Sequence, residues 1–141
     1  MRLALLFSFI AATLGCSSSS TPTPTGAECP SPDPMSLTWD SFGSHFMTTY
    51  CTDCHDSTLK HAQRNGAPLY HDYDMLSGVL ETIDHVDEYA GAGPAASNSD
   101  MPPSKCPTTP GGPLDRACPQ PTDDERAQLS IWLACEKARD H

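Results

Sequence analysis

Apolar or small residues recur at helical spacing in three stretches of the chain. The first stretch places them at i, i+3, i+4, i+7 and i+11: Trp39, Phe42, Gly43, Phe46 and Tyr50. The second places them at Leu76, Val79, Leu80, Ile83 and Val86, and the third at Leu129, Trp132 and Leu133. No stretch alternates apolar and polar residues as a half-buried strand does. The pattern therefore predicts an all-α fold of three or four helices.

The last of these helices has a predicted start. Thr122 follows Pro121 and precedes Glu125 by three residues, which is the spacing of a capping box. In this motif the two side chains bind backbone N–H groups that the first helical turn leaves without partners. Acidic residues at this end also match the helix dipole.

The N-terminal residues have the pattern of an export signal. Arg2 precedes the apolar run Leu3–Ala12, which is too short to span a bilayer. The residues from Thr13 to Cys16 resemble the lipobox of bacterial lipoproteins, although Leu is usual at the position of Thr13. The resemblance implies cleavage after residue 15 and acylation of Cys16. The alternative is an ordinary cleaved signal in which Cys16 has no role.

This pattern divides the chain into three predicted segments. A signal peptide covers 1–15, a lipidated tether rich in Ser, Thr and Pro covers 16–36, and one domain covers 37–141. The lipobox resemblance implies a periplasmic protein of a Gram-negative-type bacterium, anchored to a membrane through its lipid. Ser17, directly after the acylated Cys, favours the outer membrane over the inner membrane.

Composition narrows the classes of partner. The 141 residues suffice for one small domain with a modest core. Eight basic residues against 18 acidic ones give a net charge of −10. This balance argues against nucleic acid, because phosphate backbones need Lys and Arg, and it fits a protein partner with a basic face.

The sequence Cys51-Thr-Asp-Cys54-His55 carries the main candidate chemistry. Two Cys separated by two residues and followed by His form the attachment signature of a c-type haem. The spacing suits two vinyl groups on one porphyrin edge, and it places His55 under the iron as the proximal ligand. The alternatives are a thioredoxin-like dithiol, which needs a βαβ pattern, a zinc site, which needs further ligands, and a Cys51–Cys54 disulfide.

Together these features resemble a small mono-haem cytochrome c of class I. Its first helix has a Gly eight residues before the attachment motif, at the position of Gly43, and an aromatic residue of its last helix, here Trp132, packs on that Gly. Its distal loop supplies a Met, which matches Met101 in the sequence Met101-Pro-Pro. The resemblance implies a cytochrome c-like domain around one covalent haem c, with His55 and Met101 as axial ligands. It also implies a one-electron carrier between redox protein partners rather than an enzyme, so no catalytic residue is expected.

The resemblance assigns supporting residues as well. A Pro carbonyl in such cytochromes accepts a hydrogen bond from the proximal His, and Pro68 matches that place. Arg64 either faces a haem propionate or is a plain surface cation. The sixth ligand has alternatives: an open or labile site, or one of His61, His71 and His85. An open site would indicate a small haem peroxidase, an oxidase accessory subunit or a haem-based sensor.

Four of the seven cysteines remain after Cys16 and the attachment pair: Cys29, Cys106, Cys118 and Cys135. An even number in an exported chain predicts two disulfides, which allow three connectivities. We favour Cys106–Cys118, which closes a loop rich in Pro and Gly. A Cys29–Cys135 bridge would then tie the N-terminal extension to the last helix, and the other pairings stay open.

Overall fold

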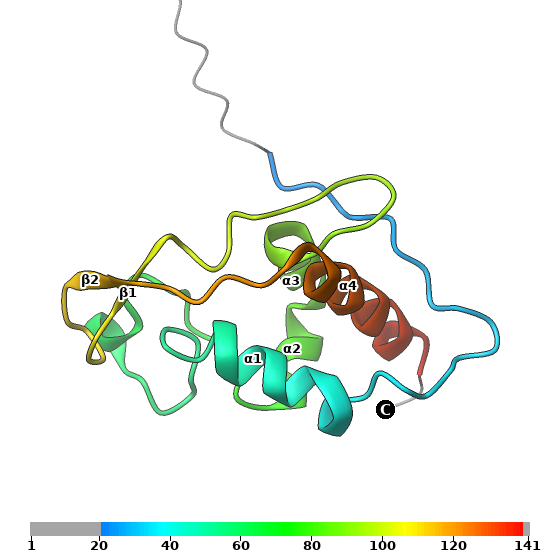
Figure 1. The fold of residues 1–141 in the computed structure, drawn as a ribbon. Coiled ribbons are helices and arrows are strands. Elements are labelled where there is room, and N and C mark those ends of the chain that lie inside the picture. Colours follow the sequence, from blue (N-terminus) through cyan, green and yellow to red (C-terminus); the bar gives the residue numbers. More distant parts are fainter. Residues whose placement is uncertain (1–20, 140–141) are drawn as a thin grey trace, which may run out of the picture.

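A computed structural model describes residues 21–139 of the chain (Figure 1). Its α-helices are α1 Ser44–Tyr50, α2 Leu76–Glu81, α3 Ile83–Ala90 and α4 Asp123–Ala138. A π-helix at Trp39–Gly43 precedes α1, and a 3-10 helix covers His61–Arg64. The strands are β1 Lys105–Pro107 and β2 Leu114–Ala117. The predicted signal peptide, 1–15, and the predicted lipid site, Cys16, lie outside the described residues.

The prediction of an all-α fold was wrong. Strands β1 and β2 pair as an antiparallel sheet beside the helices, which makes a small mixed fold. Lys105 lies opposite Ala117 and Cys106 opposite Arg116, and the register shifts before Pro107. Strands of three and four residues are too short to show alternation in a sequence. The favoured Cys106–Cys118 disulfide is present and closes this hairpin.

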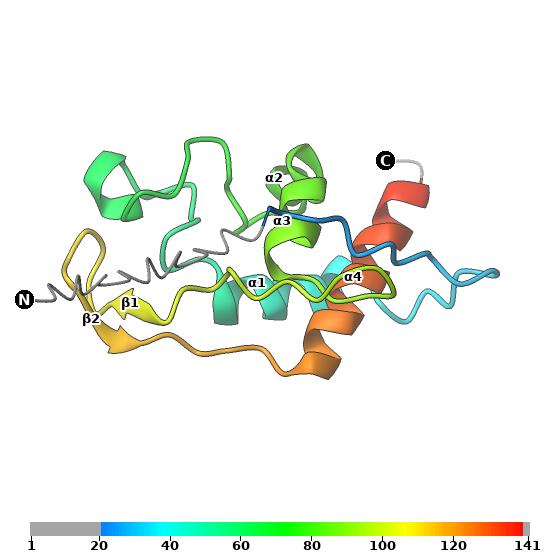
Figure 2. The same ribbon diagram turned by 90° about the horizontal axis from the view of Figure 1, so that it is seen from above.

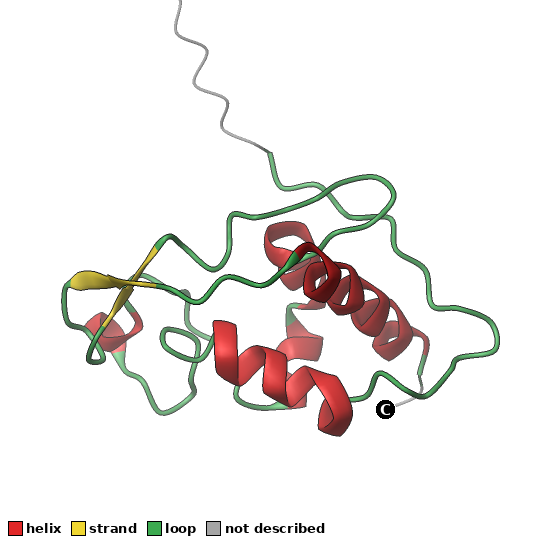
Figure 3. Ribbon diagram, in the orientation of Figure 1, coloured by secondary structure: helices red, strands yellow, loops and turns green. Residues whose placement is uncertain are grey.

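Helices α1 to α4 gather at one end of the molecule, and the sheet lies at the other end with the 3-10 helix beside it (Figure 1, Figure 2). Long loops connect the two ends (Figure 3). The buried core comes mainly from the three predicted helical stretches: Phe46, Met47, Tyr73, Val79, Ile83, Val86, Ala90, Leu129, Trp132 and Leu133. The middle stretch is not one helix, because the chain breaks at Thr82 between α2 and α3. The Thr82 hydroxyl binds the Gly78 carbonyl at 3.3 Å, which competes with the helical pattern of hydrogen bonds.

Contact between Gly43 and Trp132 brings the π-helix Trp39–Gly43 and α4 together, as predicted. A Cβ atom on Gly43 would lie 2.6 Å from Cη2 and 2.9 Å from Cε2 of the Trp132 ring, so only Gly allows this approach. Trp132 is fully buried, and its indole N–H donates to Glu136 at 2.7 Å. The predicted capping box of α4 is confirmed: the Thr122 hydroxyl accepts from the Glu125 N–H, and Glu125 accepts from the Thr122 N–H at 2.8 Å.

The segment before the first helix packs on the domain. Thr25 is fully buried, and it donates its N–H and its hydroxyl to the Asp87 carboxylate of α3 at 2.8 and 2.7 Å. Cys29 forms the favoured disulfide with Cys135 of α4, and Asp33 pairs with Arg139. The described part of the predicted tether, 21–36, is therefore fastened to the helices. Within residues 21–139 we find no helix long and apolar enough to cross a membrane.

Candidate functional site

The attachment motif forms the turn that ends α1. Cys51 is the C-cap of this helix, and its N–H donates to the Met47 carbonyl at 2.8 Å. The N–H groups of Cys54 and His55 both donate back to the Cys51 carbonyl, at 3.2 and 3.0 Å. Residues three and four apart in such a turn lie on one side of it. Local winding therefore presents both thiols and the imidazole together.

Both thiols of the motif are free. The Cys51–Cys54 disulfide considered above therefore does not form here. The other cysteines of the described residues are paired in disulfides. Burial raises the pKa of the Cys51 thiol to about 12, and the nearby Arg126 charge offsets only part of this effect. Burial and the neighbouring Asp53 also raise the pKa of the Cys54 thiol. A redox-active dithiol or a nucleophile needs the opposite shift, so the thioredoxin-like alternative is disfavoured.

The zinc alternative lacks ligands in the described part of the chain. The group with metal-like spacing there consists of Cys29, Asp33 and Cys135. Its two sulfur atoms form a disulfide, and its carboxylate pairs with Arg139. No thiolate is left in that group to bind zinc.

His55 has the state and the support of an iron ligand. Its Nδ1 atom lies 3.0 Å from the His71 carbonyl oxygen, which can only accept, so Nδ1 carries the proton. Burial lowers the pKa of His55 to about 4, and the ring is neutral at neutral pH. The ring also stacks on Tyr73 at 4.6 Å, with 15° between the planes. Nε2 keeps its lone pair and has no hydrogen bond within residues 21–139, so it fits a bond to iron.

The structure assigns the support of His55 to His71 and not to Pro68 as predicted. The Pro68 carbonyl accepts a hydrogen bond from Arg64 Nη2 at 2.8 Å. Between these positions the chain turns through Tyr70, which has a left-handed φ of 69°. This turn presents the next carbonyl, that of His71, to the imidazole. A backbone carbonyl as the partner of the His55 ring was predicted. Which carbonyl reaches the ring depends on the path of the loop.

Both interpretations of Arg64 were wrong. Its side chain is 2 % exposed, so Arg64 is not a surface cation. A guanidinium has five N–H donors, and all of them are used within the protein. Their acceptors are the Asp72 carboxylate, at 2.7 Å, and the carbonyls of Asp56, Ala67, Pro68 and His71. No donor is left for a propionate, and Arg64 instead holds together the loop that positions His55.

Met101 is held by its backbone. Its N–H donates to the Tyr89 carbonyl at 2.9 Å, and its carbonyl accepts from Arg126 at 2.8 Å. Its side chain is 39 % exposed. None of the contacts in the described chain joins the Met101 side chain to His55, so Met101 stays a prediction as the sixth ligand.

The histidine alternatives occupy different places. His71 lies with its carbonyl on the Nδ1 side of the His55 ring, away from Nε2, which disfavours it as the opposite ligand. The ring of His85 is 5.3 Å from that of His71, and it stacks at 6.0 Å on Tyr89. His61 is exposed at the start of the 3-10 helix. We therefore keep Met101 as the preferred candidate.

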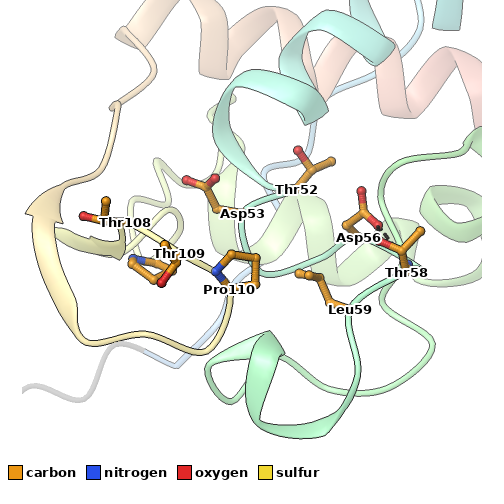
Figure 4. A pocket seen from close by; sticks show the side chains of 9 residues that line it. Thr52, Asp53, Asp56, Thr58, Leu59, Thr108, Thr109 and Pro110 are labelled. Atoms are coloured by element: carbon orange, nitrogen blue, oxygen red, sulfur yellow. Dashed lines mark hydrogen bonds between the residues drawn. The ribbon is translucent and has the colours of Figure 1, made fainter.

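A pocket of about 200 Å³ lies between the attachment motif and the hairpin (Figure 4). Ligand pockets of proteins usually measure ~300–1,000 Å³, so this pocket is too small for a typical substrate. Asp53 of the motif pairs with Arg116 of β2 beside it. The hairpin therefore covers one side of the motif, which the sequence did not predict. The lining residues are Thr52, Asp53, Asp56, Thr58, Leu59, Pro107, Thr108, Thr109 and Pro110.

Two residues of the site escaped the sequence argument. No local signal marks the His71 carbonyl, because its approach depends on the fold. Arg126 had a weak signal: a cation in the first turn of a helix opposes the helix dipole and needs another reason to be there.

Comparison with protein-family models, with curated protein sequences and with solved structures gives no match for this chain.

Proposed function

We propose that the protein is an exported c-type haem protein that carries one electron at a time. One observation carries the proposal: Cys51, Cys54 and His55 share a single turn, with two free thiols and a neutral, oriented imidazole. A bound haem would supply an iron atom that gains and loses one electron.

Each residue of the site has a defined role in this proposal. The S–H groups of Cys51 and Cys54 would each add across one vinyl double bond, which forms two thioethers without a leaving group. His55 would bind iron through Nε2, while its Nδ1–H stays on the His71 carbonyl. Met101 would bind on the other side as a thioether ligand. Groups held in this way move little when the charge of the site changes, which favours fast electron transfer.

The proposal is tested on the protein matured in a periplasm with a haem-attachment system. We expect one haem that stays bound after denaturation, and none in the Cys51→Ala/Cys54→Ala variant. Oxidised protein should show the weak near-infrared band of iron bound by Met sulfur. Met101→Ala should lose this band. Met75→Ala should keep it, and Met75 is a matched control because its side chain is also exposed, at 43 % against 39 %.

The other outcomes have clear meanings. High-spin or carbon monoxide-binding wild-type protein would contradict the carrier and support the peroxidase, the oxidase accessory subunit or the sensor. Protein with no covalent haem would overturn the whole proposal.

We propose that Cys16 anchors this carrier to a membrane from the periplasmic side, with the outer membrane favoured. Thr23 already binds Asn98 of the domain through its carbonyl. The six residues between Cys16 and Thr23 span at most about 25 Å, so the anchor would keep the domain near the membrane. Labelled palmitate should enter wild-type protein and not Cys16→Ala, and cell fractionation would then identify the membrane.

We propose redox partners with a basic docking face, because the chain has a net charge of −10. The rate of electron exchange with a basic protein should fall steeply as ionic strength rises. A rate independent of salt would contradict electrostatic docking.

A further inference from the structure

Arg126 lies in the first turn of α4 with its side chain 5 % exposed. The Asp123 carboxylate acts on it electrostatically, but within residues 21–139 Arg126 forms no close ion pair such as those of Arg64, Arg116 and Arg139. A buried cation without an ion-pair partner is costly, and a cation at the N-terminus of a helix adds to that cost. The position of Arg126 therefore calls for a physical reason.

The Arg126 guanidinium binds the backbone of the loop that carries Met101. We call residues 98–103 the Met101 loop. The Nη1 atom of the guanidinium donates to the carbonyls of Ala90 at 2.8 Å, Asn98 at 3.1 Å and Met101 at 2.8 Å. These carbonyls belong to the end of α3 and to both ends of the segment from Asn98 to Met101. One side chain thus fixes the entry and the exit of this segment relative to α4.

Gln120 adds hydrogen bonds further along the same loop. Its Nε2 atom donates to the carbonyls of Pro102 at 3.3 Å and Pro103 at 3.0 Å, and its Oε1 atom lies 3.5 Å from Arg126 Nη2. We call the contacts of Arg126 and Gln120 with the Met101 loop the clamp. Every residue of the Met101-Pro-Pro sequence therefore has its carbonyl bound by Arg126 or Gln120. Gln120 contributes hydrogen bonds without a charge, which makes it useful for separating two effects.

The charge of Arg126 also reaches the attachment motif. It acts electrostatically on the Cys51 thiol, the first attachment residue. The same guanidinium is bound to the Met101 carbonyl. Arg126 thus acts electrostatically on a proposed attachment residue and binds the backbone of the proposed distal ligand.

We propose that Arg126 is a positioning residue of the haem site, which holds the Met101 loop in its ligating position and adds a positive charge that raises the reduction potential. The inference rests on the proposed function and deepens it. A nearby positive charge disfavours ferric iron, which carries one more positive charge than ferrous iron. Three carbonyls stabilise the guanidinium but leave its net charge in place.

Four variants of the matured protein test the two parts of the proposal, the positioning of the loop and the effect of the charge. Arg126→Met removes the charge and the clamp, and it should lower the midpoint potential. It should also shift the loss of the near-infrared band to lower urea concentration. Arg126→Lys keeps the charge, but its Nζ atom ends one bond short of the position of Nη1, so the three carbonyl contacts and the band should weaken while most of the potential remains. Gln120→Ala should weaken the band alone, and Lys137→Met is the control for loss of a charge, because Lys137 is a basic residue in the last turn of the same helix that pairs with Asp84.

Hydrogen exchange at the Met101 N–H gives a second readout of the loop. This N–H is bound to the Tyr89 carbonyl. In Arg126→Met it should exchange about tenfold faster or more, because a hydrogen bond to a charged group contributes at least that factor.

The outcomes separate this inference from the proposed function. Wild-type protein without covalent haem, or without Met ligation, fails the proposed function before any variant is compared. Normal wild-type protein, with the potential, the band and the exchange rate unchanged in Arg126→Met, would overturn the inference alone. If Arg126→Met does not fold, Arg126→Lys and Gln120→Ala test whether the clamp holds the loop. The positioning role would be overturned if the near-infrared band of both variants resisted urea as well as that of the wild type.

Discussion

Substitution of Gly43 by Ala should destabilise the protein, although Ala favours helices. Gly43 has ordinary helical torsion angles, φ −58° and ψ −50°, so its backbone tolerates any residue. The obstacle is the Trp132 ring, with Cη2 at 2.6 Å and Cε2 at 2.9 Å from the new Cβ. Carbon atoms attract best at ~3.5–4.0 Å, so the ring or the helix must move by about 1 Å. Trp132 is fully buried and hydrogen-bonded to Glu136, which opposes this movement.

The magnitude follows from two opposing terms. Overpacking a core costs about 1–3 kcal/mol, and the overlap with several ring atoms places this site at the upper end. Replacing Gly by Ala in a helix contributes about 1 kcal/mol in the other direction. The net loss of unfolding free energy should be about 2 kcal/mol, or roughly 8–12 °C in Tm for a domain of this size.

Urea unfolding of the protein, followed by far-ultraviolet circular dichroism, measures this loss. The matched test repeats Gly43→Ala in a Trp132→Phe background, where the smaller ring leaves room for the Cβ. There the substitution should cost much less or stabilise, which gives a coupling free energy of about 1–2 kcal/mol. An equal cost of Gly43→Ala in both backgrounds would refute the steric argument.

Two further predictions concern the helix start and the disulfides. Hydrogen bonds from Thr122 hold the pKa of Glu125 below its usual value, so this pairing contributes stability above pH 4.5 that is lost as pH falls through the folded pKa. Thr122→Ala should therefore cost about 1 kcal/mol at pH 7 and less in acid, as measured by urea titrations across pH, and a pH-independent cost would contradict the contact of the Thr122 hydroxyl with the Glu125 carboxylate. Replacing both cysteines by Ser in the Cys29–Cys135 bridge, with a sequence separation of 106, should cost about 2 kcal/mol more than in the Cys106–Cys118 bridge, with a separation of 12. Thermal unfolding of the two variants checks this order, and a larger loss for the shorter loop would contradict the chain-entropy argument.

Features that depend on a few neighbouring residues were predictable. The capping box joins residues three apart, and the turn of the attachment motif joins residues up to four apart. Helical spacing also identified most of the core, because residues on one face of a helix are buried together. The close approach of Trp132 to Gly43 followed from the family resemblance and not from the spacing alone.

Features that join distant residues were not predictable. The sheet was not predicted because its strands are too short to show an alternation of apolar and polar residues, and a Pro/Gly-rich loop separates them. Arg64 looked like a ligand for a propionate, but the fold brings five acceptors around it. Pro68 was the wrong carbonyl for His55, since the turn at Tyr70 presents His71 instead.

The sequence by itself determined that Cys51, Cys54 and His55 share one turn, because their spacing sets which side chains that turn presents together. Only the tertiary structure decided which distant groups meet: the His71 carbonyl and the His55 ring, and the Arg126 guanidinium and the Met101 carbonyl. Those contacts span 16 and 25 residues of chain. Local spacing is set by helical geometry, whereas contacts over such distances depend on how every intervening loop packs.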